Sequence, residues 1–154
     1  MGGGFAWERM RALIQRAKHG KVSVAGRVIA EIEHGLVILL GIGHDDGEDQ
    51  AAFLTEKIAN LRIFEDAEGK MNLSLHETGG GAIVVSQFTL YGDVRKGRRP
   101  SFTDAALPDA ARPLVDRFAQ LMVEQGVPTQ QGEFGAHMLV EIQNDGPVTI
   151  WLEK

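Results

Sequence analysis

The 154-residue sequence contains no cysteine and no hydrophobic run long enough to cross a membrane. Without cysteine there is no disulfide framework, no thiolate nucleophile and no Cys-based metal site, and the absence suits a reducing compartment. Positive charge is also scarce, because 16 Lys and Arg residues stand against 21 Asp and Glu residues, which leaves a net charge of −5. This balance argues against a broad basic surface for duplex nucleic acid and leaves only a local basic patch open.

Several motifs of catalysis and cofactor binding are missing as well. The sequence has no His-x-x-x-His pair and no His-Glu-x-x-His, so its five histidines predict no zinc site. The triplet Gly79-Gly80-Gly81 lacks the Gly-Lys-Ser/Thr of a phosphate-binding loop. We therefore expect neither a metal nor another cofactor.

The length and the 44% hydrophobic content fit one globular domain with a core large enough to fold alone. Residues 1–9 lack the basic start and apolar middle of a signal peptide. We expect them to be a loosely ordered extension, with residues 10–154 forming the single domain.

Apolar runs and alternation predict several strands. Residues 35–41 are apolar throughout, which is typical of a buried central strand, and residues 82–90 predict a second one. Ala25-Gly26 lies between two short strand-like segments and predicts a hairpin. The expected strands are residues 11–16, 21–24, 27–32, 35–41, 82–90, 137–143 and 148–152.

Two segments have the spacing of amphipathic helices. Residues 48–60 begin with acidic side chains, which suit the positive end of a helix dipole, and carry one apolar face. A second helix is expected from about residue 108 to residue 125. Strands with two main helices predict a compact α/β sandwich in which the helices cover one face of the sheet system.

The segment Ser86-Gln87-Phe88-Thr89 carries the candidate hydroxyl nucleophiles. In a continuous strand Gln87 and Thr89 would share one face, and Ser86 and Phe88 the other. Ser86 is not in a Gly-x-Ser-x-Gly elbow, which argues against an α/β-hydrolase triad. The alternative from the residues alone is an ordinary strand with locally hydrogen-bonded hydroxyls.

The dipeptide Gly146-Pro147 interrupts a stretch that otherwise reads as strand. Proline has no N–H and a fixed φ, so it cannot occupy a central ladder. Local chemistry predicts a strand-to-strand turn over residues 144–147. A cis peptide bond is the alternative, because the free-energy difference between the cis and trans forms is smaller before proline than before other residues.

Four cations, Arg95, Lys96, Arg98 and Arg99, lie within five positions of an acidic chain. Such a cluster can contact phosphates. A solvated loop or a subunit contact is the alternative.

Taken together, three motifs resemble the D-aminoacyl-tRNA deacylase family. They are the segments at residues 86–90 (Ser-Gln-Phe-Thr-Leu), 95–102 (Arg-Lys-Gly-Arg-Arg-Pro-Ser-Phe) and 144–149 (Asn-Asp-Gly-Pro-Val-Thr). Residues 10–16, 60–64 and 69–74 fit the same pattern, and the resemblance runs in order from Met10 to the C-terminus. It implies a three-layer α/β/β sandwich with mixed sheets, and a cytoplasmic homodimer that hydrolyses the ester of D-aminoacyl-tRNA.

The resemblance also implies an active site shared between subunits. Residues 86–89 would form one wall, and a cis Gly146-Pro147 would reach in from the partner with both carbonyls accepting hydrogen bonds from the substrate α-ammonium. Arg16 would brace this loop, and Met138 and Phe134 would line the pocket. Since this filter works on the Cβ, glycyl-tRNA should also be a substrate.

Two mechanisms and two other functions stay open at this point. Backbone N–H groups near Phe88 and Thr89 would stabilise the oxyanion while the adenosine 2′-hydroxyl activates water, or Thr89 would act as the nucleophile. A non-catalytic nucleic-acid-binding dimer of the same fold is one alternative. A relative with a trans Gly-Pro bond that accepts L-alanyl esters is the other.

Overall fold

The computed structural model describes residues 9–154, so the expected N-terminal extension lies, apart from Arg9, outside the described residues. Its frame is a pair of long antiparallel strands, β1 (Arg11–Val24) and β8 (Leu139–Glu153). The strand order is β2-β1-β3-β6-β7, with β8 also paired to β1. Strands β3 (Gly35–Gly41) and β6 (Gly81–Ser86) lie parallel at the centre, and β7 (Thr129–Gln131) is parallel to β6.

Strand β1 serves two layers because it changes partner halfway. Residues 11–17 pair with β3, and residues 20–24 pair with β2 (Arg27–Ile32). Gly20 lies at the change, where an added Cβ would come within 2.9 Å of the Val37 side chain. The two predicted strands at residues 11–16 and 21–24 are therefore wrong as separate elements, since they are one strand that bends.

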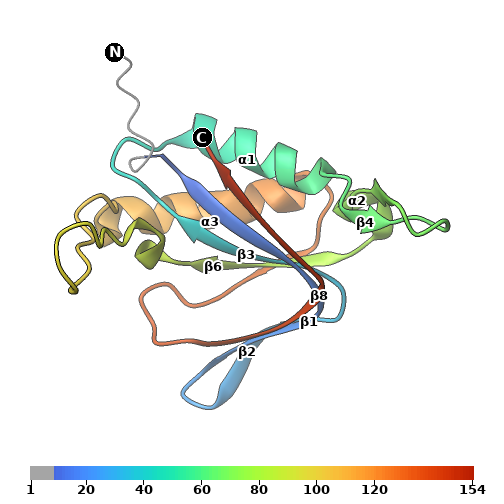
Figure 1. Ribbon diagram of the computed structural model, residues 1–154, viewed down its shortest axis with the longest axis horizontal. Coiled ribbons are helices and arrows are strands. Elements are labelled where there is room, and N and C mark those ends of the chain that lie inside the picture. The colour runs from blue at the N-terminus through green and yellow to red at the C-terminus, as the bar shows by residue number, and fades with distance from the viewer. Residues whose placement is uncertain (1–8) are drawn as a thin grey trace.

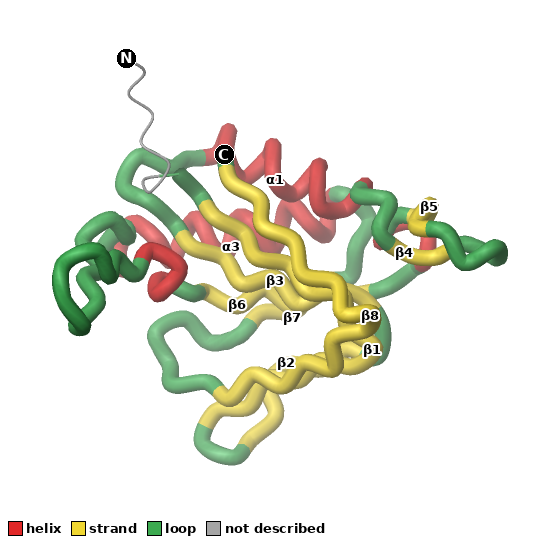
Figure 2. Tube along the Cα trace, in the orientation of Figure 1, coloured by secondary structure: helices red, strands yellow, loops and turns green. Residues whose placement is uncertain are grey.

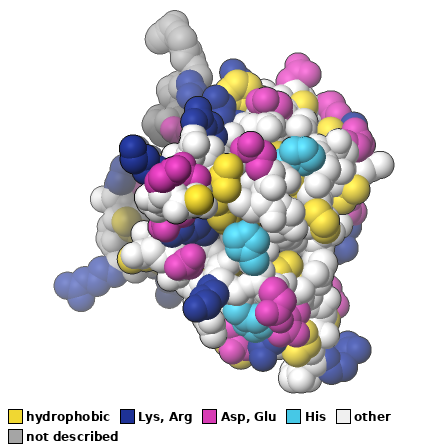
Figure 3. Space-filling model, turned by 90° about the vertical axis from the view of Figure 1, so that its right-hand side faces the viewer, with side chains coloured by type: hydrophobic (Ala, Val, Ile, Leu, Met, Phe, Trp, Pro, Cys, Tyr) yellow, Lys and Arg dark blue, Asp and Glu magenta, His cyan; other side chains and the backbone are white. Residues whose placement is uncertain are grey.

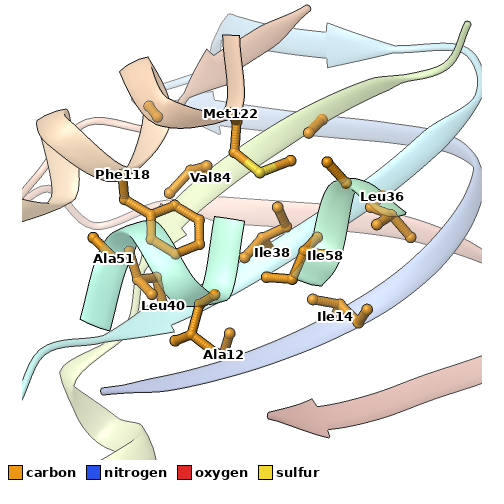
Figure 4. Close-up of a cluster of buried hydrophobic side chains, with 14 of the residues drawn as sticks. Ala12, Ile14, Leu36, Ile38, Leu40, Ala51, Ile58, Val84, Phe118 and Met122 are labelled. Atoms are coloured by element: carbon orange, nitrogen blue, oxygen red, sulfur yellow. The ribbon is translucent and has the colours of Figure 1, made fainter. Parts of the chain in front are cut away.

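The helices α1 (Glu48–Asn60) and α3 (Pro108–Glu124) cover one face of the central strands (Figure 1). Helix α1 begins with Glu48 and Asp49, and α3 begins with proline at its first position, where no N–H is needed. Their buried residues recur every three or four positions, as an amphipathic helix requires. Figure 4 shows the resulting core, in which Phe118 and Met122 point toward Val84 and Leu40 of the sheet.

A second core fills the opposite face of the sheet. Val37, Ile83 and Val85 of the central strands pack there against Val22 and Ala30 of the bent β1–β2 part. Figure 2 shows β2 and the bent ends of β1 and β8 on the side away from the helices. Helices, central sheet and outer sheet make the three-layer α/β/β sandwich that was expected. Short elements complete the fold: β4 (Phe64–Glu65), β5 (Met71–Leu73) and α2 (Leu75–Thr78).

Two further local predictions are wrong. The strand expected to reach residue 90 ends at Ser86, and the chain then forms a 3₁₀ turn, η2 (Phe88–Tyr91). The alternation of faces predicted for residues 86–90 therefore does not exist. The turn expected at residues 144–147 is also absent, because β8 continues through it with an irregular register opposite Ala17. Proline is tolerated where the ladder is disrupted in this way.

Candidate active site

The segment after β6 turns sharply because it is tied to the sheet at several points. The N–H of Gln87 still donates to the Leu40 carbonyl of β3 at 2.8 Å, and the N–H of Leu90 donates to the Gln87 carbonyl at 3.2 Å. The Tyr91 hydroxyl donates to the Gly41 carbonyl at 3.1 Å, and its ring is buried. Burial raises the pKa of Tyr91, so the phenol stays protonated and keeps this bond.

This turn presents backbone donors and two exposed side chains. Phe88 and Thr89 are its first residues, and N–H groups at that position have no acceptor within the helix. Phe88 is 56% exposed and packs edge-on against Phe102, with ring centroids 5.1 Å apart. The Thr89 hydroxyl accepts a hydrogen bond from the Gln87 side-chain amide. An amide nitrogen is no base, so this contact does not activate the hydroxyl.

A pocket of about 400 Å³ opens beside the turn. Its wall is mostly apolar and comes from β6, the turn, the loop before α3 and the loop before β8. Ser86, Phe88, Phe134 and Met138 line it, so four of the predicted site residues meet there. Gln87 and Thr89 flank it without being part of the wall, and the Arg112 guanidinium lies 4.8 Å above the Phe134 ring.

The sequence reasoning missed the far wall of this pocket, which the loop before α3 supplies. The pocket is also lined by Ile42, Phe102, Ala105, Ala106, Leu107, Pro108, Ala111, Gly135 and Ala136. The run of small residues at 105–106, next to a helix-starting proline, was the available signal. A bridge between Gly43 and Ala105 and the bond from the Ala106 N–H to the Ile42 carbonyl at 2.8 Å hold the loop in place.

The Gly146–Pro147 peptide bond is cis, as the resemblance implied, and both residues are exposed. Arg16 lies behind this loop and is only 5% exposed. It donates to the Asp145 carbonyl at 2.9 Å and to the Ile63 carbonyl at 2.7 Å. The Asn144 side chain accepts the Val148 N–H at 2.7 Å, which closes the loop from the other side. The expected bracing contact of Arg16 is thus present.

Within one chain the two halves of the predicted site lie far apart. Gly146 lies beside Arg16 of β1, and Arg16 pairs with Leu36 of β3. Leu36 in turn pairs with Ala82, near the start of β6, whereas Ser86 is the last residue of β6. Four residues along the strands and three strands across correspond to roughly 20 Å. In Figure 1 the turn after β6 lies at the left and the bend of β8 at the right. Figure 3 faces the latter end, where acidic and basic side chains are interspersed.

The basic segment forms an exposed loop closed by a bridge between Asp93 and Ser101. Arg95 is exposed but paired with Asp93, because its Nε and Nη2 donate to the two carboxylate oxygens of that residue at 2.9 and 2.7 Å. These bonds lower the pKa of Asp93 to about 2. Lys96, Arg98 and Arg99 are exposed as well.

Within residues 9–154 no group of three or more His, Cys, Asp or Glu side chains is arranged to hold a metal ion. No helix in the same range is long and apolar enough to span a membrane.

The chain is similar in sequence to proteins of one family. Residues 13–153 match the family model described as D-Tyr-tRNA(Tyr) deacylase. The chain is 56% identical over 145 residues to a D-aminoacyl-tRNA deacylase of Thermomicrobium roseum, covering 94% of each chain. It is 58% identical over 145 residues to that of Thermus aquaticus, covering 94% of this chain and 95% of the relative.

Two solved structures are similar in fold. One is that of a c-Myc DNA Unwinding Element Binding Protein, with 38% identity, a TM-score of 0.87 and coverage of 94% of this chain and 98% of that one. The other is that of a probable eukaryotic D-amino acid tRNA deacylase, with 20% identity, a TM-score of 0.81 and coverage of 95% and 100%, which shows the fold alone. The family model and the sequence identities show that the chain belongs to the D-aminoacyl-tRNA deacylase family of hydrolases.

Proposed function

We propose that this chain hydrolyses the ester between a D-amino acid and the terminal adenosine of tRNA, releasing both as free products. The observation that carries the proposal is the apolar pocket whose rim is formed by the first residues of the Phe88–Tyr91 turn. Aromatic and aliphatic walls suit a nucleobase, and turn amides without an intrahelical acceptor suit the ester carbonyl beside it.

The proposed chemistry uses the backbone and the RNA. Water adds to the ester carbonyl carbon, the N–H groups of Phe88 and Thr89 stabilise the oxyanion, and the ribose oxygen leaves with a proton. One such donor is typically worth about 2.7–4 kcal/mol of transition-state stabilisation. The Thr89 hydroxyl is bonded to an amide donor and not to a base, so nothing in this contact activates it. The adenosine 2′-hydroxyl would therefore activate the water.

The rival mechanism has Thr89 as a covalent nucleophile. Thr89→Ala separates the two, with Thr89→Ser as the control that keeps a hydroxyl. We expect Thr89→Ala to keep near-normal turnover of D-tyrosyl-tRNA. Loss of turnover with tRNA binding intact would support the nucleophile instead.

We further propose a homodimer in which Gly146–Pro147 of one subunit completes the pocket of the other. The supporting facts are the exposure of this dipeptide, its rigid support by Arg16 and its distance from Ser86 in the same chain. Its carbonyls would accept hydrogen bonds from the α-ammonium, and the loop would block an L side chain. Selectivity of this kind comes from steric rejection.

The decisive measurement compares hydrolysis of D-tyrosyl-, L-tyrosyl-, glycyl- and L-alanyl-tRNA by purified protein. We expect cleavage of the D-tyrosyl ester and measurable cleavage of the glycyl ester, because glycine has no Cβ to reject. The L esters should survive, and cleavage of the L-alanyl ester would support the L-alanyl-accepting alternative instead. No cleavage of the D ester would refute the proposal.

Contact with the tRNA backbone is assigned to Lys96, Arg98 and Arg99, since Arg95 is held by Asp93. Charge reversal at the three positions should weaken binding to all tRNAs and lower the salt slope by about 1 for each lost phosphate contact. Arg27→Glu, in the exposed β1–β2 hairpin, is the control. An unchanged salt dependence of tRNA binding in the triple variant would show that the segment is a solvated loop or a subunit contact.

A second candidate is a non-catalytic dimer that binds nucleic acid. The 38%-identical structure favours it, because that protein is named as a DNA unwinding element binding protein. A binding module has no need of the turn at residues 86–89 or of the cis Gly146–Pro147 loop, so deacylation of the D ester decides between the two. A cytoplasmic location belongs to the first proposal and suits a chain without cysteine.

A further inference from the structure

Arg11, the first residue of β1, lies beside the active-site turn although it is 79 positions away in sequence. Its Nη1 donates to the Leu90 carbonyl at 2.7 Å. The side chain is only 13% exposed, so this charge-assisted bond is largely shielded from water. The carbonyl lies near the end of a 3₁₀ turn, where intrahelical donors are lacking.

Two aromatic rings orient the guanidinium. Its central carbon lies 4.5 Å from the centroid of the Tyr91 ring and 5.6 Å from that of Trp151. The Glu153 carboxylate is 3.9 Å from Nε. The Arg11 backbone pairs with Gly41 of β3 and with Glu153 of β8, so the side chain extends from a strand that is paired on both edges.

We infer that Arg11 is a positioning residue for ester hydrolysis, which holds the Phe88–Tyr91 turn so that its first N–H groups meet the developing oxyanion. The inference rests on the function proposed above. The turn is short and internally bonded, since the Gly92 N–H donates to the Thr89 carbonyl at 3.0 Å. A displacement of the Leu90 carbonyl is therefore passed on to the N–H groups of Phe88 and Thr89.

The geometry requires arginine rather than any cation. A planar guanidinium can lie over the Tyr91 and Trp151 rings while one nitrogen donates in a fixed direction. A lysine ammonium could reach the Leu90 carbonyl but would not be oriented by the two rings. Replacing Arg11 by lysine should therefore keep tRNA binding but leave the hydrogen bond to the Leu90 carbonyl less well directed.

The test is the hydrolysis of D-tyrosyl-tRNA by Arg11→Met, Arg11→Lys and, as the matched control, Glu153→Gln. The control removes the charge beside Arg11 and leaves the bond to Leu90. We expect Arg11→Met to lower kcat and kcat/KM together by about ten- to a hundredfold, because a shift of about 1 Å at a reacting group has effects of that size. Arg11→Lys should fall between Arg11→Met and wild type, and Glu153→Gln should match wild type.

A second measurement does not depend on catalysis. Amide hydrogen exchange in Arg11→Met should speed up at residues 88–92 and stay unchanged in β3 and β6. Wild-type kcat in both Arg11 variants, a loss confined to KM, or an equal loss in Glu153→Gln would overturn the inference while leaving the proposed function standing. If Arg11→Met does not fold, Arg11→Lys alone decides by the same criteria. An inactive wild-type protein would refute the proposed function and this inference with it.

Discussion

Replacing Arg16 by methionine is expected to lower the free energy of unfolding by about 3–5 kcal/mol. Arg16 is 5% exposed and makes two bonds to backbone carbonyls, at 2.9 Å to Asp145 and at 2.7 Å to Ile63. A hydrogen bond to a charged group contributes about 1.5–3 kcal/mol, and two of them account for most of the expected loss. Methionine keeps the buried aliphatic volume, so the effect isolates the guanidinium.

The ion pairs of Arg16 add little to this figure. Its Nη2 lies 3.6 Å from Glu65 and its Nε 3.8 Å from the Asp145 carboxylate, and these partner side chains are 56% and 58% exposed. Ion pairs with exposed partners contribute about 0–1 kcal/mol each. The expected loss is a large share of the roughly 5–15 kcal/mol that stabilises a typical domain.

Urea denaturation at fixed protein concentration measures the effect, since association would change the apparent stability. Lys21→Met is the control, because Lys21 is on the same strand but forms a partly exposed ion pair with Glu141 at 3.5 Å. We expect the control to lose less than about 1 kcal/mol. A loss of under about 1 kcal/mol in Arg16→Met would refute the reasoning that its two backbone bonds are strong.

Three further predictions concern the carboxyl group of Asp46, the core and the pocket. Burial raises the pKa of Asp46 to about 6 from 3.8, so ionisation of this carboxyl opposes folding. The free energy of unfolding of the wild type should therefore fall as the pH rises from 4 to 6, by roughly 1–3 kcal/mol when solvent screening of this half-buried group is included. Urea denaturation of Asp46→Asn should show a flatter dependence on pH. Phe118→Ala, at a fully buried position, should lose about 3–5 kcal/mol in the same assay. Phe102→Ala removes a pocket wall and should raise KM for D-tyrosyl-tRNA more than it lowers kcat; an unchanged KM would contradict binding there.

Local patterns in the sequence were sufficient for the helices and the central strands. The acidic first turn and the apolar spacing of residues 48–60 coincide with α1, and the expected second helix differs from α3 by one residue at its end. The apolar run at residues 35–41 is β3 in full. These elements follow from short-range periodicity, which burial against one face preserves.

The predictions failed where a distant partner decides the local conformation. Nothing within residues 86–90 signals the 3₁₀ turn, because its geometry is held by Gly41, Leu40 and Arg11 from other strands. Residues 17–20 looked like a break, yet they continue β1, since β8 pairs along almost its whole length. The sequence did not distinguish the four cations of the basic segment, and only the fold shows that Arg95 is paired with Asp93.

Motifs and periodic patterns in the chain were enough to predict the family, the α/β class and the candidate site residues. How those residues meet depends on the packing of distant segments. That packing gathered Ser86, Phe88, Phe134 and Met138 around one pocket and added the wall at residues 105–108. It also separated the Gly146–Pro147 loop from Ser86, which lies on another strand and at the other end of the paired segments. The physical reason is that pairing register and packing join positions far apart in the chain, and no local pattern encodes such distances.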